Sequence, residues 1–186
     1  MRADNHYFPI VSATLMLFWA ALTGCSSKPA ETAPDRSAAA KALFEDTTKM
    51  FHTPSAEAKG AEKARLQNEA AARYEQLLKK FPEQQYWAAQ ARHGLGNIRA
   101  AQGQLDQAVK HYAAVEKDYP EQKWEVLTCW KSAADLLFEA GRREEAKAFY
   151  RKIVNRFDVA QASPIEKAII RGSKMHLDGG DLPREK

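Results

Sequence analysis

Hydrophobic side chains recur at helical spacing along most of the chain. Between residues 66 and 175 the apolar positions follow one another at intervals of three and four, and polar or charged residues fill the positions between them. This period places the apolar side chains on one face of a helix. The pattern therefore predicts an all-α protein in which each helix buries one face.

The helical pattern repeats when the chain is shifted by 38 residues. Four columns of like residues then align: a small alanine, a tyrosine, an aliphatic residue and an aromatic residue. Within a unit they follow one another at spacings of four, three and four, so they trace one helix face. The columns are Ala70, Ala108 and Ala146; Tyr74, Tyr112 and Tyr150; Leu77, Val115 and Ile153; and Phe81, Tyr119 and Phe157.

Each unit has the helix-ending residues that are typical of a helical hairpin. Gly103 and Gly141 align with each other, and we expect them just past a helix end, where a left-handed residue closes the hairpin. Pro82 and Pro120 follow the aromatic column and end the second helix. A single hairpin cannot bury its apolar face alone, so the units are expected to stack.

These positions resemble the tetratricopeptide repeat. The matching residues are Leu95, Gly96, Gly103, Ala108, Tyr112 and Pro120 in one unit, and Trp130, Ala134, Gly141, Ala146 and Tyr150 in the next. Asp158 stands where the repeat has proline, and each unit is longer than the usual repeat of about 34 residues. Lengthened units of this kind are similar to those of outer-membrane β-barrel assembly lipoproteins and of the Tol-Pal coordinator family. The resemblance implies an α-solenoid of about three such hairpins plus a capping helix.

We assign the repeat domain to residues 37–176. Its first unit is divergent: Thr53 and Pro54 read as a helix cap followed by proline, and a long helix is expected from there to about Lys80, with Gly60 as a weak point.

At the other end Ser163 and Pro164 begin the capping helix, and a charged tail follows over residues 177–186. The apolar residues expected on the capping helix are Ile165, Ala168, Ile169 and Met175.

The chain begins with an apolar segment from Tyr7 to Leu22, preceded by the base Arg2. Its length suits the hydrophobic region of a signal peptide and is short for a membrane span. The segment ends in Leu22-Thr23-Gly24-Cys25, which resembles the lipobox of bacterial lipoproteins. The alternative is an N-terminal anchor that is not cleaved, with an incidental cysteine.

The resemblance implies that residues 1–24 are a lipoprotein signal peptide and that cleavage leaves Cys25 at the N-terminus. Cys25 would then carry a thioether-linked diacylglyceryl group and an N-acyl chain such as palmitate, and several acyl chains anchor a protein stably. Residues 25–36 read as the lipidated cysteine and a flexible tether. Ser26, in place of aspartate, implies the periplasmic face of the outer membrane.

The composition argues against several functional classes. The chain has 28 Lys and Arg against 24 Asp and Glu, and the net charge of +4 is spread over segments of mixed sign. This is unlike the dense basic face of a nucleic-acid binder. We find no catalytic constellation, so we expect no enzyme, no cofactor and no small-molecule substrate.

The cysteines and histidines do not predict a metal site. Cys25 and Cys129 are the two cysteines, and Cys129 lies on a packing helix, where a core position is a better interpretation than a redox or metal role. Two of the five histidines, His93 and His111, could approach each other across two helices, but no ligand spacing supports a metal there.

In repeats of this type the first helices line a concave groove. By alignment the groove positions are Gln90, His93, Asn97, Thr128, Lys131 and Asp135. Asn97 matches the asparagine of a clamp for peptide carboxylates, but the basic residues of that clamp are not reproduced. The groove would suit an extended or helical segment of a protein partner in the cell envelope.

The functional prediction is a membrane-anchored periplasmic scaffold that binds protein partners during outer-membrane assembly or maintenance. The alternatives are a pilot lipoprotein for a secretin or pilus, and a regulator of peptidoglycan enzymes.

Overall fold

The computed structural model describes residues 32–157 and 159–179. The chain divides into two compact units, Met1–Ala30 and Glu31–Lys186, and all described residues belong to the second. The predicted signal peptide, Cys25 and most of the tether lie outside the described residues, as do residues 180–186 of the tail.

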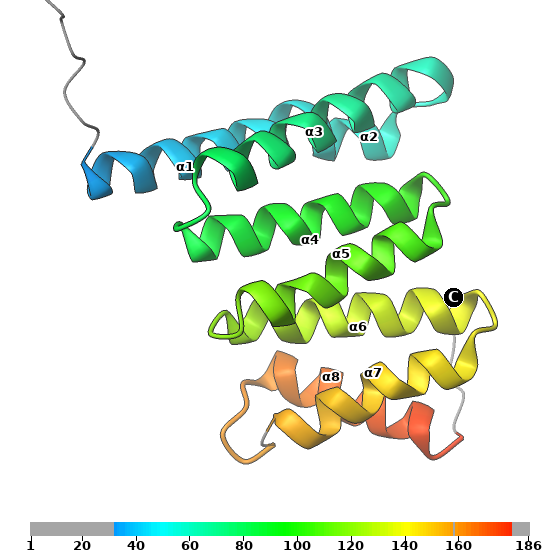
Figure 1. The fold of residues 1–186 in the computed structure, drawn as a ribbon. Helices are drawn as coiled ribbons and strands as arrows, with labels where there is room; N and C mark the ends of the chain where they lie inside the picture. The colour runs from blue at the N-terminus through cyan, green and yellow to red at the C-terminus, as the bar shows by residue number, and fades with distance from the viewer. Residues whose placement is uncertain (1–31, 158, 180–186) are drawn as a thin grey trace, which may run out of the picture. The chain divides into compact units, whose positions relative to one another are not determined.

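The described part of the chain is helical throughout. Its elements are α1 (Ala33–Thr47), a π-helical turn η1 (Thr48–His52), α2 (Thr53–Glu57), α3 (Gly60–Lys80), α4 (Gln85–Ala101), α5 (Leu105–Asp118), α6 (Lys123–Glu139), α7 (Arg143–Arg156) and α8 (Pro164–Leu177). From α3 onward each helix packs on the next (Figure 1). None of the described helices is both long enough and apolar enough to cross a bilayer. The predicted α-solenoid of helical hairpins is confirmed.

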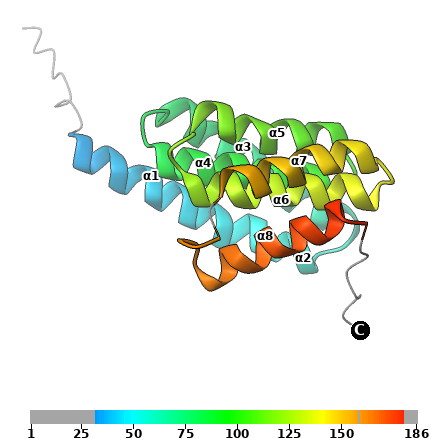
Figure 2. The same ribbon diagram turned by 90° about the horizontal axis from the view of Figure 1, so that it is seen from below.

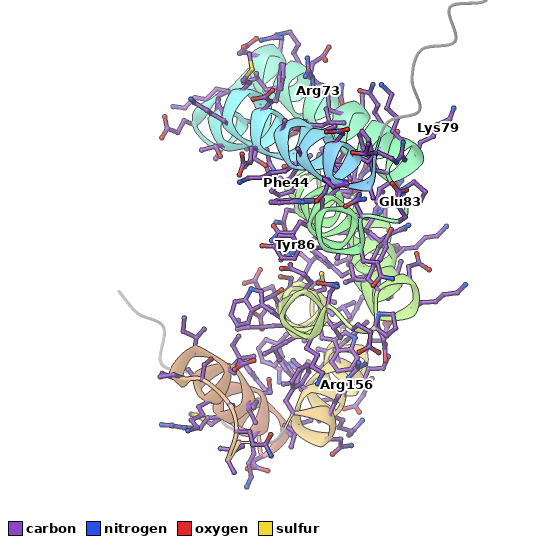
Figure 3. All side chains as sticks on the ribbon, turned by 90° about the vertical axis from the view of Figure 1, so that its left-hand side faces the viewer. Phe44, Arg73, Lys79, Glu83, Tyr86 and Arg156 are labelled. Atoms are coloured by element: carbon purple, nitrogen blue, oxygen red, sulfur yellow. The ribbon has the colours of Figure 1, made fainter. Side chains whose placement is uncertain are left out.

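The helices of this unit form two rows. In Figure 3, α1, α4, α6 and α8 lie along one side and α3, α5 and α7 along the other. We call the first set the inner helices and the second set the outer helices. The inner side is concave in this view, with α1 and α8 at its two ends, and the labelled residues Phe44 and Tyr86 lie on it.

The core runs between the two rows and consists of the predicted columns. All three alanines, all three tyrosines and all three aliphatic residues are buried on the outer helices. The aromatic column is buried at Phe81 and Tyr119 and half-buried at Phe157. The predicted glycines are also confirmed, because Gly103 and Gly141 follow helix ends with φ of 74° and 77°, a backbone region that favours glycine.

The tether ends earlier than predicted. Thr32 caps α1 in a capping box with Asp35, and Pro34 lies in the first turn, so the last residues assigned to the tether are helical. Proline fits the first turn of a helix because its missing N–H has no partner to lose there. The proline that suggested a flexible segment therefore belongs to a helix start.

The long helix expected from Thr53 to Lys80 is wrong. The chain is already helical when it reaches Thr53, so that residue makes no cap, and α2 ends at Glu57. A new helix begins at Gly60, whose φ of 55° reverses the chain direction. The weak point predicted at Gly60 is a break between α2 and α3.

Of the apolar residues expected on α8, only Ile169 packs against the core. Ser163 caps the helix as predicted, but Ile170 and Ser173 are its buried residues, whereas Ile165 and Met175 are exposed. α6 begins 38 residues after α4 (Lys123 against Gln85), but α8 begins 41 residues after α6 (Pro164 against Lys123), so the residues of α8 fall three places later than a 38-residue repeat predicts.

Candidate partner-binding face

The inner helices present equivalent residues at equivalent places. When α4, α6 and α8 are aligned at their first residues, four positions one turn apart follow each helix along the concave side. We call this set the inner face. It consists of Tyr86, Gln90, His93 and Asn97 on α4; Trp124, Thr128, Lys131 and Asp135 on α6; and Ile165, Ile169, Gly172 and His176 on α8. All six groove positions predicted from the sequence belong to it.

A row of exposed apolar side chains crosses the inner face near the helix starts. Tyr86, Trp124 and Ile165 occupy the second position of α4, α6 and α8, and they are 47%, 44% and 63% exposed. We call these three residues the apolar row. Large exposed apolar side chains that cluster on one surface mark interaction sites. The sequence prediction missed this row because it selected only polar positions.

Two predicted groove residues have a structural role inside their own repeat. The buried Tyr112 hydroxyl donates a 2.8 Å hydrogen bond to Asn97 Oδ1, and the buried Tyr150 hydroxyl donates a 2.8 Å bond to Asp135 Oδ1. Asn97 and Asp135 are equivalent positions, so the repeat has the same bond twice. The polar groups of these two residues therefore serve the packing of their own repeats.

In the first unit the tyrosine hydroxyl has different hydrogen-bond partners. The Tyr74 hydroxyl lies 2.8 Å from Thr48 Oγ1 and 2.9 Å from His52 Nδ1, both on the π-helical turn η1. Burial raises the pKa of Tyr74 to about 12, so the hydroxyl stays protonated. Burial also lowers the pKa of His52, and the nearby His93 lowers it further.

The other predicted groove residues also have partners within the protein. Lys131 pairs with Asp135 one turn away. The Thr128 hydroxyl donates to the carbonyl oxygen of Trp124 at 3.0 Å. The inner face is therefore close to neutral at α6, because the charges of its base and its acid cancel each other.

Glu125 joins the predicted residues and was missed by the sequence prediction. Its carboxylate is buried between α4 and α6, where Gln90 Nε2 donates to it at 3.2 Å. His93 Nδ1 lies 3.7 Å from the other carboxylate oxygen. Gln90 Nε2 also donates to the Tyr86 hydroxyl at 2.8 Å. These contacts fix the polar side chains below the apolar row and leave its rings exposed.

A hollow follows at the α8 end of the inner face. It has a volume of about 250 Å³ and is lined by Lys131, Asp135, Tyr150, Ile165, Ala168, Ile169, Gly172, Ser173 and His176. The side chains from α8 are mostly apolar or small. His176 stacks on the Tyr150 ring with the centroids 4.6 Å apart and closes one wall. The hollow could take an apolar side chain of a partner.

The remaining candidates for chemistry lie elsewhere or are buried. Cys129 is buried in α6, as predicted, and burial together with nearby Glu125 raises the pKa of its thiol. His111 is on the outer helix α5, where burial and nearby bases lower its pKa. Within residues 32–157 and 159–179, no three acidic, histidine or cysteine side chains are grouped to hold a metal.

The family model of the tetratricopeptide repeat matches residues 90–121 and 132–158. These two segments are similar to tetratricopeptide repeats. The first covers most of α4 and all of α5, and the second covers the end of α6 and all of α7. No curated protein matches the chain. Tetratricopeptide repeats generally mediate protein–protein interactions, so the inner face belongs to a fold that serves as a scaffold.

The hydrogen bond between the Tyr112 hydroxyl and Asn97 is expected to make a measurable contribution to stability. We expect Asn97→Ala to lower the free energy of unfolding by about 0.5–1.5 kcal/mol, because the Tyr112 hydroxyl loses its acceptor. Tyr112→Phe is expected to cost a similar amount, and the double variant no more than the larger single change. Urea denaturation measures all three.

Asn155→Ala is the matched control, because Asn155 is exposed on the outer helix α7 and forms no hydrogen bond among the described residues. It carries the same gain in helix propensity and should change stability by about 0.5 kcal/mol or less. If the costs of Asn97→Ala and Tyr112→Phe simply add in the double variant, the two side chains do not act as a pair.

Proposed function

We propose that this protein is a lipid-anchored periplasmic scaffold that holds a protein partner on its inner face during assembly or maintenance of the outer membrane. The fold supplies the scaffold, and the N-terminal segment that ends in Leu22-Thr23-Gly24-Cys25 supplies the anchor. The proposal combines a binding surface with confinement to a membrane. Confinement raises the effective concentration of the scaffold for partners at the same membrane without any new contact.

The apolar row is the observation that carries the binding part of the proposal. Tyr86, Trp124 and Ile165 are large, exposed and equivalent on three consecutive inner helices. Aromatic side chains contribute a large share of the energy of protein interfaces when a partner covers them. Gln90 and Thr128, one turn further along, offer polar groups beside the row, and a segment lying across the helices would meet both kinds of contact.

The inner face favours a partner segment of low charge. Its base at α6 is neutralised by Asp135, and its other predicted positions are amide, hydroxyl and imidazole side chains. The hollow beside α8 adds a place for one bulky apolar side chain. An extended or helical segment with apolar residues and few charges fits this surface.

The binding part of the proposal can be tested by site-specific photocrosslinking in a bacterial host with two membranes. A photoreactive amino acid at Trp124 is expected to capture a defined partner, and the capture should fall strongly when Tyr86→Ala is added. Lys110 on the outer helix α5 is the matched control position, because it is exposed on the other row of helices. Capture from Lys110 but not from Trp124 would place the binding surface on the outer helices.

The anchoring part can be tested separately. We expect Cys25→Ala to leave the protein unprocessed or soluble, and globomycin, which blocks the lipoprotein signal peptidase, to make the wild type accumulate as a precursor. Fractionation of membranes followed by mass spectrometry of the N-terminus measures both. Normal processing of the Cys25→Ala protein would refute the lipid anchor and leave the inner face untouched.

A further inference from the structure

Among the described residues no following outer helix lies over α8, the last inner helix. In complete repeats the fifth and twelfth residues of the inner helix are covered by the outer helix that follows: Ala89 and Leu127 are buried, and so are Gly96 and Ala134. The equivalent residues of α8 are Ala168 and Met175, which are exposed. Figure 2 looks onto this end of the unit, where no described helix covers α8.

The uncovered side of α8 carries an apolar stripe. Ile165, Ala168, Gly172 and Met175 follow one another at spacings of three, four and three, which places them along one line of the helix. The two large residues lie at the ends of the stripe and the two small ones at its centre. Ile165 and Met175 are 63% and 38% exposed. This pattern is a seam for another helix, because small central residues allow two backbones to approach closely.

Gly172 lies in the middle of the stripe and leaves it open. A Cβ atom on Gly172 would meet no atom within 4 Å. Gly172 is the ninth residue of α8, the inner-face position that His93 and Lys131 hold on α4 and α6. The stripe therefore continues from the inner face onto the uncovered side of α8, with space for a second helix at its centre.

One flank of the stripe is basic. Lys167, Arg171 and Lys174 follow one another at spacings of four and three along the same side of α8, and none of them forms an ion pair within the described residues. Some bases at the outer helices are paired instead: Arg142, just before α7, pairs with Asp106, and Lys152 Nζ lies 2.6 Å from Glu116. We call Lys167, Arg171 and Lys174 the basic flank.

The charges of α8 itself cannot complement the basic flank. Glu166 is held at the helix start, where its carboxylate accepts from the Ser163 N–H at 2.7 Å, and Asp178 lies beyond the helix end. A second copy of α8 would bring the same three bases, and its own Glu166 and Asp178 lie at its two ends and not along the stripe. Charge complementarity therefore favours a different helix, one whose apolar residues are bordered by acidic side chains.

We propose that the apolar stripe and basic flank of α8 bind an amphipathic helix of a partner protein whose apolar face is bordered by aspartate and glutamate. The bound helix would lie on α8 as an outer helix lies on the inner helix before it, and it would complete one more hairpin of the solenoid. This surface shares Ile165 with the apolar row and borders the hollow of the inner face, but it does not include Tyr86 or Trp124. The inference therefore does not depend on the lipid anchor or on binding at Trp124.

The test uses the full chain and two designed helical peptides of about four turns. Both peptides carry the same apolar stripe, one bordered by glutamate and the other by lysine. We expect the glutamate peptide to bind at least roughly tenfold more tightly, as measured by fluorescence anisotropy, with a preference that shrinks at high salt. The double change Arg171→Glu, Lys174→Glu should reverse the preference, and Met175→Asp should weaken both peptides by roughly tenfold or more.

Trp124→Ala is the control on the inner face and should leave peptide binding unchanged. Circular dichroism checks that each variant keeps its helices. The inference is overturned if neither peptide binds, if both bind equally well, or if Met175→Asp has no effect. Sedimentation velocity tests whether the protein dimerises through α8. If the wild-type protein forms a dimer and Met175→Asp abolishes it, α8 binds a second copy of the chain, and the inference is overturned.

Discussion

Replacing Trp130 with alanine is expected to lower the free energy of unfolding by about 3–5 kcal/mol. The side chain is only 2% exposed and lies in α6 between the two rows of helices. Its ring meets Phe157 edge-on with the centroids 6.1 Å apart, and the Arg156 guanidinium lies 5.4 Å from its centroid. Alanine would leave a large cavity at the point where α6 and α7 meet. Urea denaturation measures the change as a lower midpoint at constant slope.

Trp124 provides a control of the same residue type on the same helix. It is 44% exposed in the apolar row, so Trp124→Ala should change stability by about 0.5 kcal/mol or less. It should nevertheless strongly reduce crosslinking from a photoreactive amino acid placed at Thr128, one turn along the inner face. If Trp130→Ala lowers stability and Trp124→Ala lowers binding alone, the two tryptophans of α6 have separate roles. Equal losses of stability in both variants would contradict the positions assigned to the two rings.

Adding one methyl group at Gly96 is expected to destabilise the protein by about 1–3 kcal/mol. The new Cβ atom would lie 2.3 Å from Tyr112 Cε1 and 2.5 Å from Cδ1, closer than atoms can approach. The tyrosine ring is buried and its hydroxyl is bonded to Asn97, so it cannot move away without losing that bond. Gly96→Ala should therefore lower the midpoint of thermal and urea unfolding.

The same change at Gly172 is expected to have the opposite sign. No atom lies within 4 Å of the new Cβ atom, and alanine is favoured over glycine inside a helix by about 0.5–1 kcal/mol. Gly172→Ala should therefore raise stability slightly. A loss of stability at Gly172 as large as that at Gly96 would mean that another helix already covers α8.

The buried columns could be predicted from the sequence because the same physical requirement recurs in each repeat. Ala108 and Ala146 meet a neighbouring helix at the same place in successive units, and Gly103 and Gly141 close successive hairpins. A requirement that returns every 38 residues leaves a pattern that a shift of the chain reveals. The candidate face was predicted in part for the same reason, since Asn97 and Asp135 are equivalent.

The remaining features depend on distances that the sequence does not contain. The hydrogen bonds of Tyr112 and Tyr150 join residues 15 apart, and helix periodicity alone says nothing about them. Tyr86 and Trp124 do align at a shift of 38, but Ile165 joins their row only at a shift of 41, because the loop before α8 is longer. Insertions in loops are invisible to a fixed period, and this one moves the residues of α8 three places later.

The buried thiol of Cys129 can be used to measure local unfolding of the helices around it. Cys129 is wholly covered, and its raised pKa keeps it in the unreactive thiol form while α6 remains in place. In a Cys25→Ser background it is the single thiol of the chain, so the rate of labelling by a thiol reagent measures how often α6 separates from its neighbours. Labelling that proceeds well below the global unfolding midpoint would show that the hairpins open one at a time, as expected for a chain of nearest-neighbour contacts.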